Sequence, residues 1–505
     1  MSRKIRISLA ALCFSLVTLL FLDFTGSVYA WAGWTAKLQL LPALLALDFG
    51  IIALLAVLTF IMGRIYCSVI CPLGVLQDII SWLHSRRRGR CHRFSYSPPH
   101  SLLRYAIFAI CIAALVCGVS PVVTLLAPYS TYGRFVSCYL SPLYRWVNNL
   151  LAGVAERFGS YAIHTTEILT PDPSVIAVTT LTFIVILIMA WRTGRTWCNA
   201  ICPVGTLLSF IARHSLFRPV IDRTACKDCG LCARSCKASC IDMRSHTIDL
   251  TRCVACMDCI GVCRHNALHY CLRRSSGGSA ESADTSSRVS SGTVEPVDSS
   301  RRSFLISSAL IAATVAEAQE KKVDGGLALI LDKCNPERNT PILPPGARSR
   351  HSFARHCTAC QLCVSVCPNN VLRPSTEVTR LMQPEMSYTV GYCRPECTRC
   401  SDVCPTGALR LAGRAEKSSL QIGHAVPLYD NCVVVTDHVP CDNCARHCPA
   451  GAVTMVAINP GEMDSLKVPV VDIERCIGCG ACENLCPARP LSAIYVEGHE
   501  VQRFI

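Results

Sequence analysis

Most of the 36 cysteines fall into six runs of four, and the spacing within each run is typical of ligands to iron–sulfur clusters. Four runs read C-x2-C-x2-C-x3-C, in which three thiolates bind one [4Fe–4S] cluster and the fourth binds a neighbouring cluster. The other two open with C-x3-C at Cys393–Cys397 or C-x8-C at Cys432–Cys441 and keep the following C-x2-C-x3-C-P. The sequence therefore predicts six [4Fe–4S] clusters. Their predicted iron ligands are Cys226, Cys229, Cys232 and Cys236; Cys253, Cys256, Cys259 and Cys263; Cys357, Cys360, Cys363 and Cys367; Cys393, Cys397, Cys400 and Cys404; Cys432, Cys441, Cys444 and Cys448; and Cys476, Cys479, Cys482 and Cys486.

Zinc ribbons and disulfides are the alternatives to clusters for these cysteines. Zinc sites usually use C-x2-C pairs separated by a dozen or more residues, and disulfides show no such triplet spacing, so clusters are favoured. Loops this short have little apolar core, and metal ligation must supply their folding energy. We expect α+β ferredoxin-like domains of short hairpins and small helices. Two runs pair when they share the ligands of two clusters. For the last four runs, spacing does not decide between two pairings. Either each run pairs with its neighbour in the sequence, or the two outer runs pair with each other and the two inner runs do the same.

Residues 1–217 are apolar enough for a membrane domain. The chain is 51 % hydrophobic, and about 20 apolar residues cross a bilayer core. We expect an α-helical bundle of four transmembrane helices. Their predicted ranges are 5–22, 38–62, 103–127 and 175–191. The first range also fits a signal peptide, but it lacks a convincing small-residue cleavage site and another span follows soon after, so we interpret it as an anchor.

Basic residues predict the orientation of this bundle, because Lys and Arg are retained on the cytoplasmic side of short loops. The N-terminus, the second loop and the segment after the fourth span are basic, whereas the first loop offers only Lys37. The basic residues are Arg3, Lys4 and Arg6; Arg64, Arg86, Arg87, Arg88, Arg90 and Arg93; and Arg192, Arg195, Arg213 and Arg218. Both ends of the bundle should therefore face the cytoplasm, which largely explains the net charge of +14. A nucleic-acid patch at 86–90 is disfavoured, since no aromatic or groove-reading element accompanies it.

A repeat lies at the cytoplasmic ends of the second and fourth predicted spans. Residues 63–80 and 194–211 share the pattern G-R-x-aromatic-C-x2-I-C-P-x-G-x-L. The paired thiols are Cys67 and Cys71 in the first copy and Cys198 and Cys202 in the second. A spacing of four puts both thiols on one face of a helix, although the proline after each pair suggests that the helix breaks there. A tight turn that uses cysteine only for its small size is the structural alternative. Two copies with two cysteines each favour redox chemistry or metal ligation over that alternative. Spacing does not distinguish redox chemistry from metal ligation.

Residues 1–272 resemble the membrane subunit of NapH-type quinol dehydrogenases, which combines four spans, two CxxxCP motifs and a two-cluster cytoplasmic ferredoxin. The same membrane core resembles that of nitrous-oxide-reductase regulators and cytochrome-oxidase assembly ferredoxins. The ferredoxin departs from the usual pattern, because Lys237 and Arg264 stand where proline is common. Cys240 adds a spare thiol nearby, and we favour Cys236 as the ligand because it keeps the x3 spacing.

Residues 273–300 are rich in Ser, Gly, Thr and acidic residues and predict a flexible linker. Residues 301–320 begin with Arg301-Arg302 and continue into a short apolar run, which resembles a twin-arginine export signal placed inside the chain. That route resembles the one used for folded, cofactor-loaded proteins. The alternative is a weak membrane-surface helix.

Residues 345–505 carry the last four runs and resemble a NapG/MauM-type periplasmic polyferredoxin, so the chain looks like a fusion of two proteins that usually work together. We divide it into five parts. They are a four-helix membrane domain at 1–217, a cytoplasmic two-cluster ferredoxin at 218–272, the linker at 273–300, the signal-like segment at 301–320 and an exported four-cluster ferredoxin domain at 345–505.

The resemblance implies a membrane-bound component of a quinol dehydrogenase, which oxidises membrane quinol and passes electrons through its [4Fe–4S] clusters to a periplasmic reductase of the nitrate reductase type. It implies the bacterial inner (cytoplasmic) membrane, with the N-terminus and the first ferredoxin in the cytoplasm and the C-terminal ferredoxin in the periplasm. Expected partners are the membrane quinone pool and a periplasmic reductase or electron carrier, and no nucleic acid. We assign electron entry, the catalytic role, to Cys67, Cys71, Cys198 and Cys202.

The rival function is an assembly, maturation or regulatory ferredoxin for a metalloenzyme, in which the CxxxCP pairs handle copper or another cofactor. Four exported clusters favour electron supply over this alternative. Asp48, inside the second predicted span, is a candidate for proton handling, and an aspartate satisfied by a neighbouring helix fits equally well. The cysteines without a motif partner are Cys91, Cys138, Cys271 and Cys334.

Overall fold

The computed structural model describes residues 3–87, 94–162, 164–168, 170–272, 331–411, 413–461 and 465–505. The described residues within Met1–Arg273 and Asn335–Ile505 pack as one compact unit. The helices and both ferredoxin regions belong to this unit. The linker and the twin-arginine-like segment predicted from the sequence lie outside the described residues.

Helices make up most of residues 3–212. They are α1 (Arg3–Leu22), α2 (Ser27–Ala32), α3 (Trp34–Lys37), α4 (Leu40–Ala46), α5 (Phe49–Met62), α6 (Tyr66–Val69), α7 (Pro72–Arg87), α8 (Ser101–Cys117), α9 (Ser120–Leu126), α10 (Pro128–Phe135), α11 (Ser141–Arg157), α12 (Pro173–Thr193) and α13 (Pro203–Ala212), with π-helical turns η1 (Val136–Leu140) and η2 (Trp197–Ile201). In the described residues α1 and α12 are long and apolar enough to cross a membrane. A helix of 20 residues is about 30 Å long, which matches the hydrocarbon core of a bilayer.

The other two predicted spans are interrupted. The range 38–62 contains α4 and α5, separated at Leu47, which has a φ of 55°, and at Asp48, whose side chain accepts a hydrogen bond from Ile51 N. The range 103–127 contains α8 and α9, and α8 ends at Gly118 with a φ of 78°. The unbroken helices α5 and α8 have 14 and 17 residues. The prediction of four full-length spans is therefore supported for α1 and α12 alone.

Each ferredoxin region consists of two-stranded antiparallel sheets and single-turn helices, as the short loops predict. The first contains β1 (Phe217–Ile221), α14 (Leu231–Ser235), β2 (Ile241–Asp242), β3 (Thr247–Ile248), α15 (Asp258–Val262) and β4 (Leu268–Leu272), and β1 pairs with β4 and β2 with β3. The second contains α17 (Arg350–His356), α18 (Leu362–Ser365), β5 (Leu372–Pro374), η3 (Val378–Arg380), β6 (Pro384–Met386), α19 (Arg399–Asp402), α20 (Arg414–Ser418), β7 (Leu420–Pro427), η4 (Tyr429–Asn431), α21 (Val433–Thr436), α22 (Asn443–Arg446), β8 (Val453–Ala457), β9 (Lys467–Val471), α23 (Ala481–Leu485) and β10 (Ile494–Phe504). Its pairs are β5–β6, β7–β10 and β8–β9.

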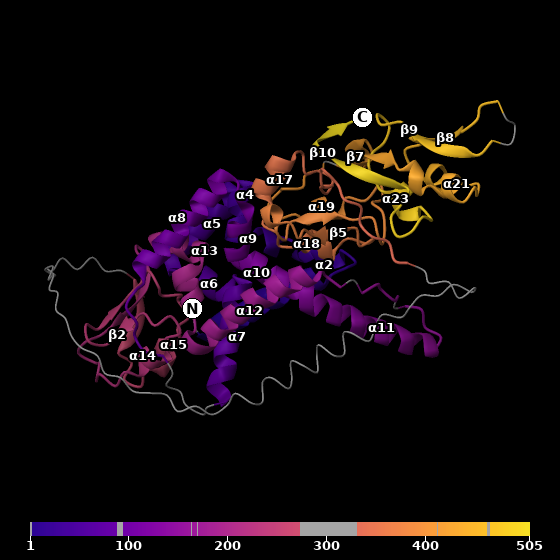
Figure 1. The fold of residues 1–505 in the computed structure, drawn as a ribbon. Helices are drawn as coiled ribbons and strands as arrows, with labels where there is room; N and C mark the ends of the chain where they lie inside the picture. The colour runs from indigo at the N-terminus through magenta and orange to yellow at the C-terminus, as the bar shows by residue number, and fades with distance from the viewer. Residues whose placement is uncertain are drawn as a thin grey trace, which may run out of the picture. The chain divides into compact units, whose positions relative to one another are not determined.

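The two ferredoxin regions contact opposite ends of the same helices (Figure 1). At the start of α1, Arg3 Nε lies 2.8 Å from Asp258 Oδ1 in the first ferredoxin. Just beyond its end, Phe24 O accepts a hydrogen bond of 3.5 Å from Arg399 in the second.

Helices α8 and α12 repeat this arrangement. Near the start of α8, Arg104 donates to Thr251 O at 3.2 Å, and near its end Val116 O accepts from Arg355 at 3.5 Å. In α12, Val175 packs with Ala359 of the C-terminal ferredoxin region. Beyond its end, Arg195 N donates to the Lys237 carbonyl of the first ferredoxin. The helices therefore separate the two ferredoxin regions by about the length of α1.

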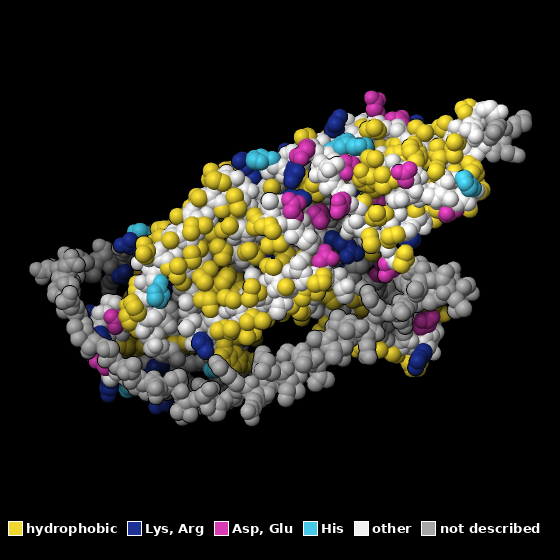
Figure 2. Space-filling model, viewed as in Figure 1, with side chains coloured by type: hydrophobic (Ala, Val, Ile, Leu, Met, Phe, Trp, Pro, Cys, Tyr) yellow, Lys and Arg dark blue, Asp and Glu magenta, His cyan; other side chains and the backbone are white. Residues whose placement is uncertain are grey.

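Hydrophobic side chains are exposed along this helical part, and Figure 2 shows them gathered over α4, α5, α8 and α13. Several are more than half exposed, among them Phe49, Leu54, Val57, Leu102, Ile110 and Val116. A soluble surface rarely carries a contiguous apolar area of this kind, whereas a lipid-facing surface requires one.

Candidate iron–sulfur and thiol sites

Five cysteines of the first ferredoxin line one cavity of about 420 Å³. They are Cys236, Cys240, Cys253, Cys256 and Cys259. The last thiol of the first run thus lies with the first three thiols of the second run, which is the crossed arrangement of two-cluster ferredoxins. Cys236 Sγ and Cys240 Sγ are 3.5 Å apart. Both thiols border the cavity, so the choice of Cys236 over Cys240 stays a prediction.

Lys237 stands where proline is common, and its contacts give a reason. Its ammonium group lies 2.9 Å from Asp258 Oδ2 in α15 and 3.6 Å from Asp78 Oδ1 in α7. Its backbone carbonyl accepts the hydrogen bond from Arg195 N at 2.9 Å. Lys237 therefore links the first ferredoxin to the helices through ion pairs. Proline has no charged side chain and could not form them.

Asp78 is the centre of this ionic network, and its side chain is only 12 % exposed. Arg195 Nη2 is 2.8 Å from Asp78 Oδ2, and Arg6 Nη1 is 3.5 Å from the same oxygen. Burial alone would raise the pKa of the Asp78 carboxyl, but Arg195, Lys237 and Arg6 together hold that pKa well below its ordinary value. Asp78 therefore remains ionised throughout the neutral range and keeps these cations paired.

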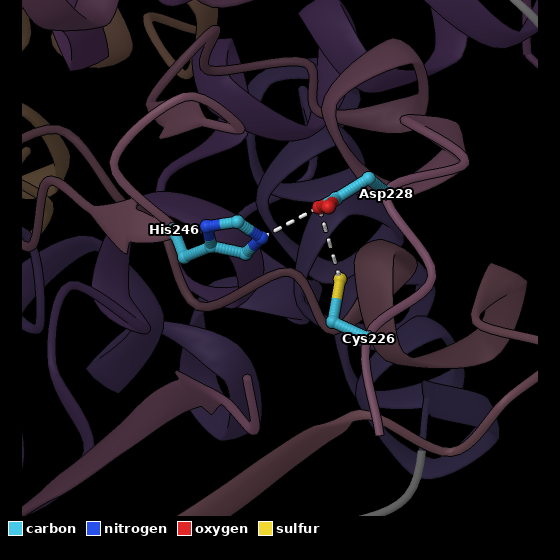
Figure 3. A group of neighbouring side chains, drawn as sticks. All are labelled: Cys226, Asp228 and His246. Carbon is cyan, nitrogen blue, oxygen red and sulfur yellow. Dashed lines mark hydrogen bonds and ion pairs between the residues drawn. The ribbon is translucent and has the colours of Figure 1, made fainter. Parts of the chain in front are cut away.

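Cys226, Asp228 and His246 form a small group at the edge of the first ferredoxin (Figure 3). Asp228 Oδ1 lies 2.5 Å from His246 Nε2 and 3.7 Å from Cys226 Sγ. Among the described residues, no other three potential metal donors from Cys, His, Asp or Glu lie mutually within 4.8 Å. Cys226 already belongs to a four-cysteine run, and as a cluster ligand it is a thiolate with no proton to donate to Asp228. We therefore interpret Asp228 and His246 as a hydrogen-bonded pair beside a cluster ligand.

A second cavity, of about 410 Å³, lies in the C-terminal ferredoxin region and has four predicted ligands in its lining. They are Cys367, Cys393, Cys397 and Cys400. Conversely, Cys404 is near the three remaining thiols of the earlier run, because its charge contributes to the raised pKa of each of them. They are Cys357, Cys360 and Cys363. In each of the first two C-terminal runs, the last thiol therefore lies with the first three thiols of the other run.

The last two runs are crossed in the same way. Cys448 acts electrostatically on the first three thiols of the final run, which are Cys476, Cys479 and Cys482. Cys486 in turn acts on Cys444. The two crossed pairs meet where Cys393 N donates a hydrogen bond of 2.9 Å to Cys479 O. Sequential pairing, which spacing could not decide, is thus the arrangement in the structure.

These groups fit [4Fe–4S] clusters chemically. In two of them four predicted thiol ligands line one cavity of restricted size, and cysteine thiolates are the usual ligands of such clusters. The clusters would supply one-electron redox chemistry at these positions. The individual ligand assignments remain predictions.

The CxxxCP repeat folds as the two prolines predict. Cys67 lies in α6 and Cys198 in η2, and a new helix starts at Pro72 or Pro203 directly after the second thiol of each pair. All four thiols are 4 % exposed. Burial raises the pKa of the thiols of Cys71, Cys198 and Cys202 above the ordinary value.

Two arginines cross between the copies of the repeat. Arg64 of the first copy donates to Cys198 O at 3.1 Å, and Arg195 of the second donates to Cys67 O at 2.6 Å. Both are fully buried. Sequence analysis used them only to predict the orientation of the bundle and did not predict their burial. The signal for a structural role was in the sequence, because each arginine belongs to the pattern G-R-x-aromatic-C that both copies of the repeat share.

Aromatic side chains that the sequence did not single out connect the thiols with the C-terminal ferredoxin region. Tyr66 and Tyr129 belong to one packed cluster with Cys67, Cys71 and Cys360, and both rings are buried. On α10, the absence of a side chain at Gly133 lets the Cys360 carbonyl approach closely. The same cluster includes Val254 of the first ferredoxin. A continuous packed core, which includes Cys67, Cys71 and Cys202, therefore joins both ferredoxin regions.

Asp48 does not lie in such a core. It is exposed and caps α5 through its hydrogen bond with Ile51 N. Its contacts give it a structural role at the break between α4 and α5.

Gly74 and Gly205 leave space for the arginine that reaches across from the other copy of the repeat. Replacing either glycine with alanine should therefore destabilise the protein to a similar extent. A Cβ at Gly74 would collide with Cys67 O and lie 2.8 Å from Arg195 Nη1; a Cβ at Gly205 would collide with Cys198 O and lie 2.6 Å from Arg64 Nη2. We expect Gly74→Ala and Gly205→Ala each to lower the free energy of unfolding by about 1–3 kcal/mol, as overpacking does. Thermal unfolding in detergent measures the loss.

The control for this prediction is Gly153→Ala on α11, where a Cβ meets nothing within 4 Å. Alanine favours a helix by up to about 1 kcal/mol over glycine, so this variant should unfold at the wild-type temperature or slightly above it. Equal unfolding temperatures for all three variants would contradict the close packing of the repeat.

Comparison with known proteins agrees with the two kinds of site. A family model described as a 4Fe-4S binding domain matches residues 44–91 and 176–223, one match for each copy of the CxxxCP repeat. A model described as a 4Fe-4S dicluster domain matches residues 356–408 and 439–489. The methylamine utilization ferredoxin-type protein MauM of Methylophilus methylotrophus is 30 % identical over 201 residues, which is 35 % of this chain and 85 % of that protein. The chain belongs to the MauM ferredoxin-type family. It is thus an iron–sulfur electron-transfer protein of the ferredoxin type.

Further relatives fit this family. MauM of Methylobacillus flagellatus is 31 % identical over 178 residues, covering 32 % of this chain and 70 % of the relative. The ferredoxin-type protein NapF of Escherichia coli K12 is 26 % identical over 179 residues, covering 35 % of this chain and 99 % of NapF. No solved structure matches the chain.

Proposed function

We propose that the protein oxidises membrane quinol and delivers the electrons through its [4Fe–4S] clusters to a periplasmic reductase or dehydrogenase system. The single observation that carries the proposal is the continuous packed core from the first ferredoxin through the buried thiols of Cys67, Cys71 and Cys202 to Cys360. The clusters would supply one-electron carriers. The protein's own side chains hold these sites in a fixed order and exclude water from the four-thiol site.

A membrane location is part of this proposal. It is supported by the two helices of sufficient length, by the apolar surface of the helical part and by the contacts of the two ferredoxin regions at opposite helix ends. We propose the inner membrane, with residues 218–272 in the cytoplasm and 345–505 in the periplasm. The name of the MauM relatives favours a methylamine-utilising system as the electron acceptor, and the resemblance of residues 1–272 to NapH-type proteins favours a nitrate reductase. The experiment below does not depend on which it is.

The test is reduction of the oxidised protein by a quinol under anaerobic conditions. We expect quinol, and not the corresponding quinone, to bleach the cluster absorbance and to produce the electron paramagnetic resonance signals of reduced clusters. Bleaching by dithionite without bleaching by quinol would refute quinol oxidation. A variant with Cys67, Cys71, Cys198 and Cys202 all replaced by serine should keep the clusters of the six runs, remain reducible by dithionite and lose reduction by quinol, because we place electron entry at these thiols.

An assembly function is the second candidate, and the burial of all four CxxxCP thiols favours it specifically, since soft thiolates also suit copper. Copper retained by the purified wild-type protein and lost from the four-serine variant would favour metal handling over electron supply.

A further inference from the structure

The four CxxxCP thiols form one site. Cys71 and Cys202, from different copies of the repeat, both interact electrostatically with Cys67 and Cys198. Three of the thiols, Cys67, Cys71 and Cys202, also belong to the same packed cluster. Because Arg64 and Arg195 cross between the copies, each half of the site is held by an arginine of the other half.

Buried hydrogen-bond donors around the thiols indicate that the site is built for an anionic group. Arg64 is fully buried, and its partners are Cys67 Sγ at 3.8 Å, Asn199 Oδ1 at 2.9 Å and the backbone carbonyls of Cys198 and Thr251. In the described part of the chain no carboxylate forms an ion pair with it. Burying a cation without an anion costs desolvation free energy. We therefore expect a negatively charged group at the thiols beside Arg64.

Gln77 provides a second, independent indication. It is 1 % exposed, and its Oε1 lies 3.4 Å from Cys198 Sγ. Its amide Nε2 is buried and has no acceptor among the described residues, nor does Arg64 Nε. Unpaired buried donors of this kind are rare in folded proteins unless a group that accepts their hydrogen bonds is bound.

The spacing of the thiols distinguishes among soft metals. Thiolates select copper(I), zinc or iron–sulfur clusters. A single zinc ion with Zn–S bonds of about 2.3 Å brings its four sulfur atoms to about 3.8 Å from one another. No three of these thiols lie mutually within 4.8 Å in the described structure, so their arrangement does not match the four close sulfur ligands of one zinc ion. Four cysteines with wider spacing suit a [2Fe–2S] or [4Fe–4S] cluster.

We propose that Cys67, Cys71, Cys198 and Cys202 are the ligands of one additional iron–sulfur cluster, shared between the two copies of the repeat, and that Arg64 balances its negative charge. This deepens the proposed function, because it states what the site of electron entry holds. It also concerns metal content alone, so its test needs no quinol and can fail while quinol oxidation stands.

The experiment compares the metal content of two full-length double variants with that of the wild-type protein, all purified anaerobically. Cys67→Ser/Cys198→Ser removes one ligand from each copy. Cys111→Ser/Cys138→Ser removes two buried thiols elsewhere in the helical part and is the matched control. We expect the first variant to lose about two to four iron atoms and as many acid-labile sulfides per chain, according to the cluster type, while the control loses none.

Three results would overturn the proposal. They are equal iron in both variants, a loss of zinc or copper in place of iron, and a loss of iron without sulfide. Native mass spectrometry of the wild-type protein gives an answer even if the first variant fails to fold. We expect the intact chain to carry the mass of seven centres, and a fully loaded species with the mass of six would refute the seventh.

Discussion

Replacing Cys448, Cys476, Cys479 and Cys482 together with serine is expected to remove one cluster, about four iron atoms per chain, and to leave the other clusters in place. The reason is the crossed arrangement, in which Cys448 lies with the first three thiols of the final run. If the outer runs paired with each other, or if each run bound its own cluster, these four thiols would belong to two clusters. Iron analysis of the full-length protein separates about four lost atoms from about eight.

A second variant with the same number of serines is the control. Replacing the whole final run, Cys476, Cys479, Cys482 and Cys486, should damage two clusters, because Cys486 lies beside Cys444 of the preceding run. We expect this variant to lose more than four iron atoms, between about five and eight, depending on whether the three-ligand cluster survives in part. An equal loss in both variants would contradict the sequential crossed pairing.

The cysteine spacing alone predicts the kind of site, because the ligand geometry of a cubane restricts the loop that surrounds it. It could not predict which runs pair. That pairing depends on contacts far apart in the sequence, such as the hydrogen bond from Cys393 N to Cys479 O. Family models that match residues 356–408 and 439–489 agree with the sequence on the kind of site.

The helical part was harder to predict because hydropathy does not detect a break within an apolar stretch. Leu47 and Asp48 interrupt one predicted span, and Gly118 ends a helix within another. Positive φ angles at Leu47 and Gly118 stop each helix without changing the apolar character of the sequence. Hydropathy therefore located α1 and α12 and did not detect the breaks within the other two apolar stretches.

Charge patterning did not predict the burial of Arg64 and Arg195. A rule that counts loop charges predicts the side of the membrane on which an arginine lies, and not whether its side chain is buried. Here the two guanidinium groups are buried and donate to carbonyl groups of the opposite copy of the repeat. The pattern shared by the two copies was the better guide, since both contain the arginine three residues before the first thiol.

Replacing Arg301 and Arg302 together with lysine is expected to keep residues 345–505 in the cytoplasm. Twin-arginine export requires the arginine pair itself, so lysine should block it while preserving the charge. These residues lie outside the described structure, but the described contacts require two separated positions, because one ferredoxin region contacts Arg3 at the start of α1 and the other contacts Phe24 just beyond its end. A helix of 20 residues spans about 30 Å, the thickness of the bilayer core, so the distance between these positions suits the proposed placement on opposite membrane surfaces.

Protease treatment of spheroplasts measures the location of the C-terminal domain, and the chain provides a matched control in its other arginine pair, Arg273 and Arg274. We expect the protease to cleave the C-terminal domain in the wild-type protein and in the Arg273→Lys/Arg274→Lys variant, and to leave it intact in the Arg301→Lys/Arg302→Lys variant. Cleavage of the latter at the wild-type rate would exclude this export route, and protection of the wild-type domain would exclude the periplasmic location itself. Protection of the wild-type domain would also contradict the proposal that α1 crosses the membrane, because the ferredoxin regions at its two ends would then lie on the same side.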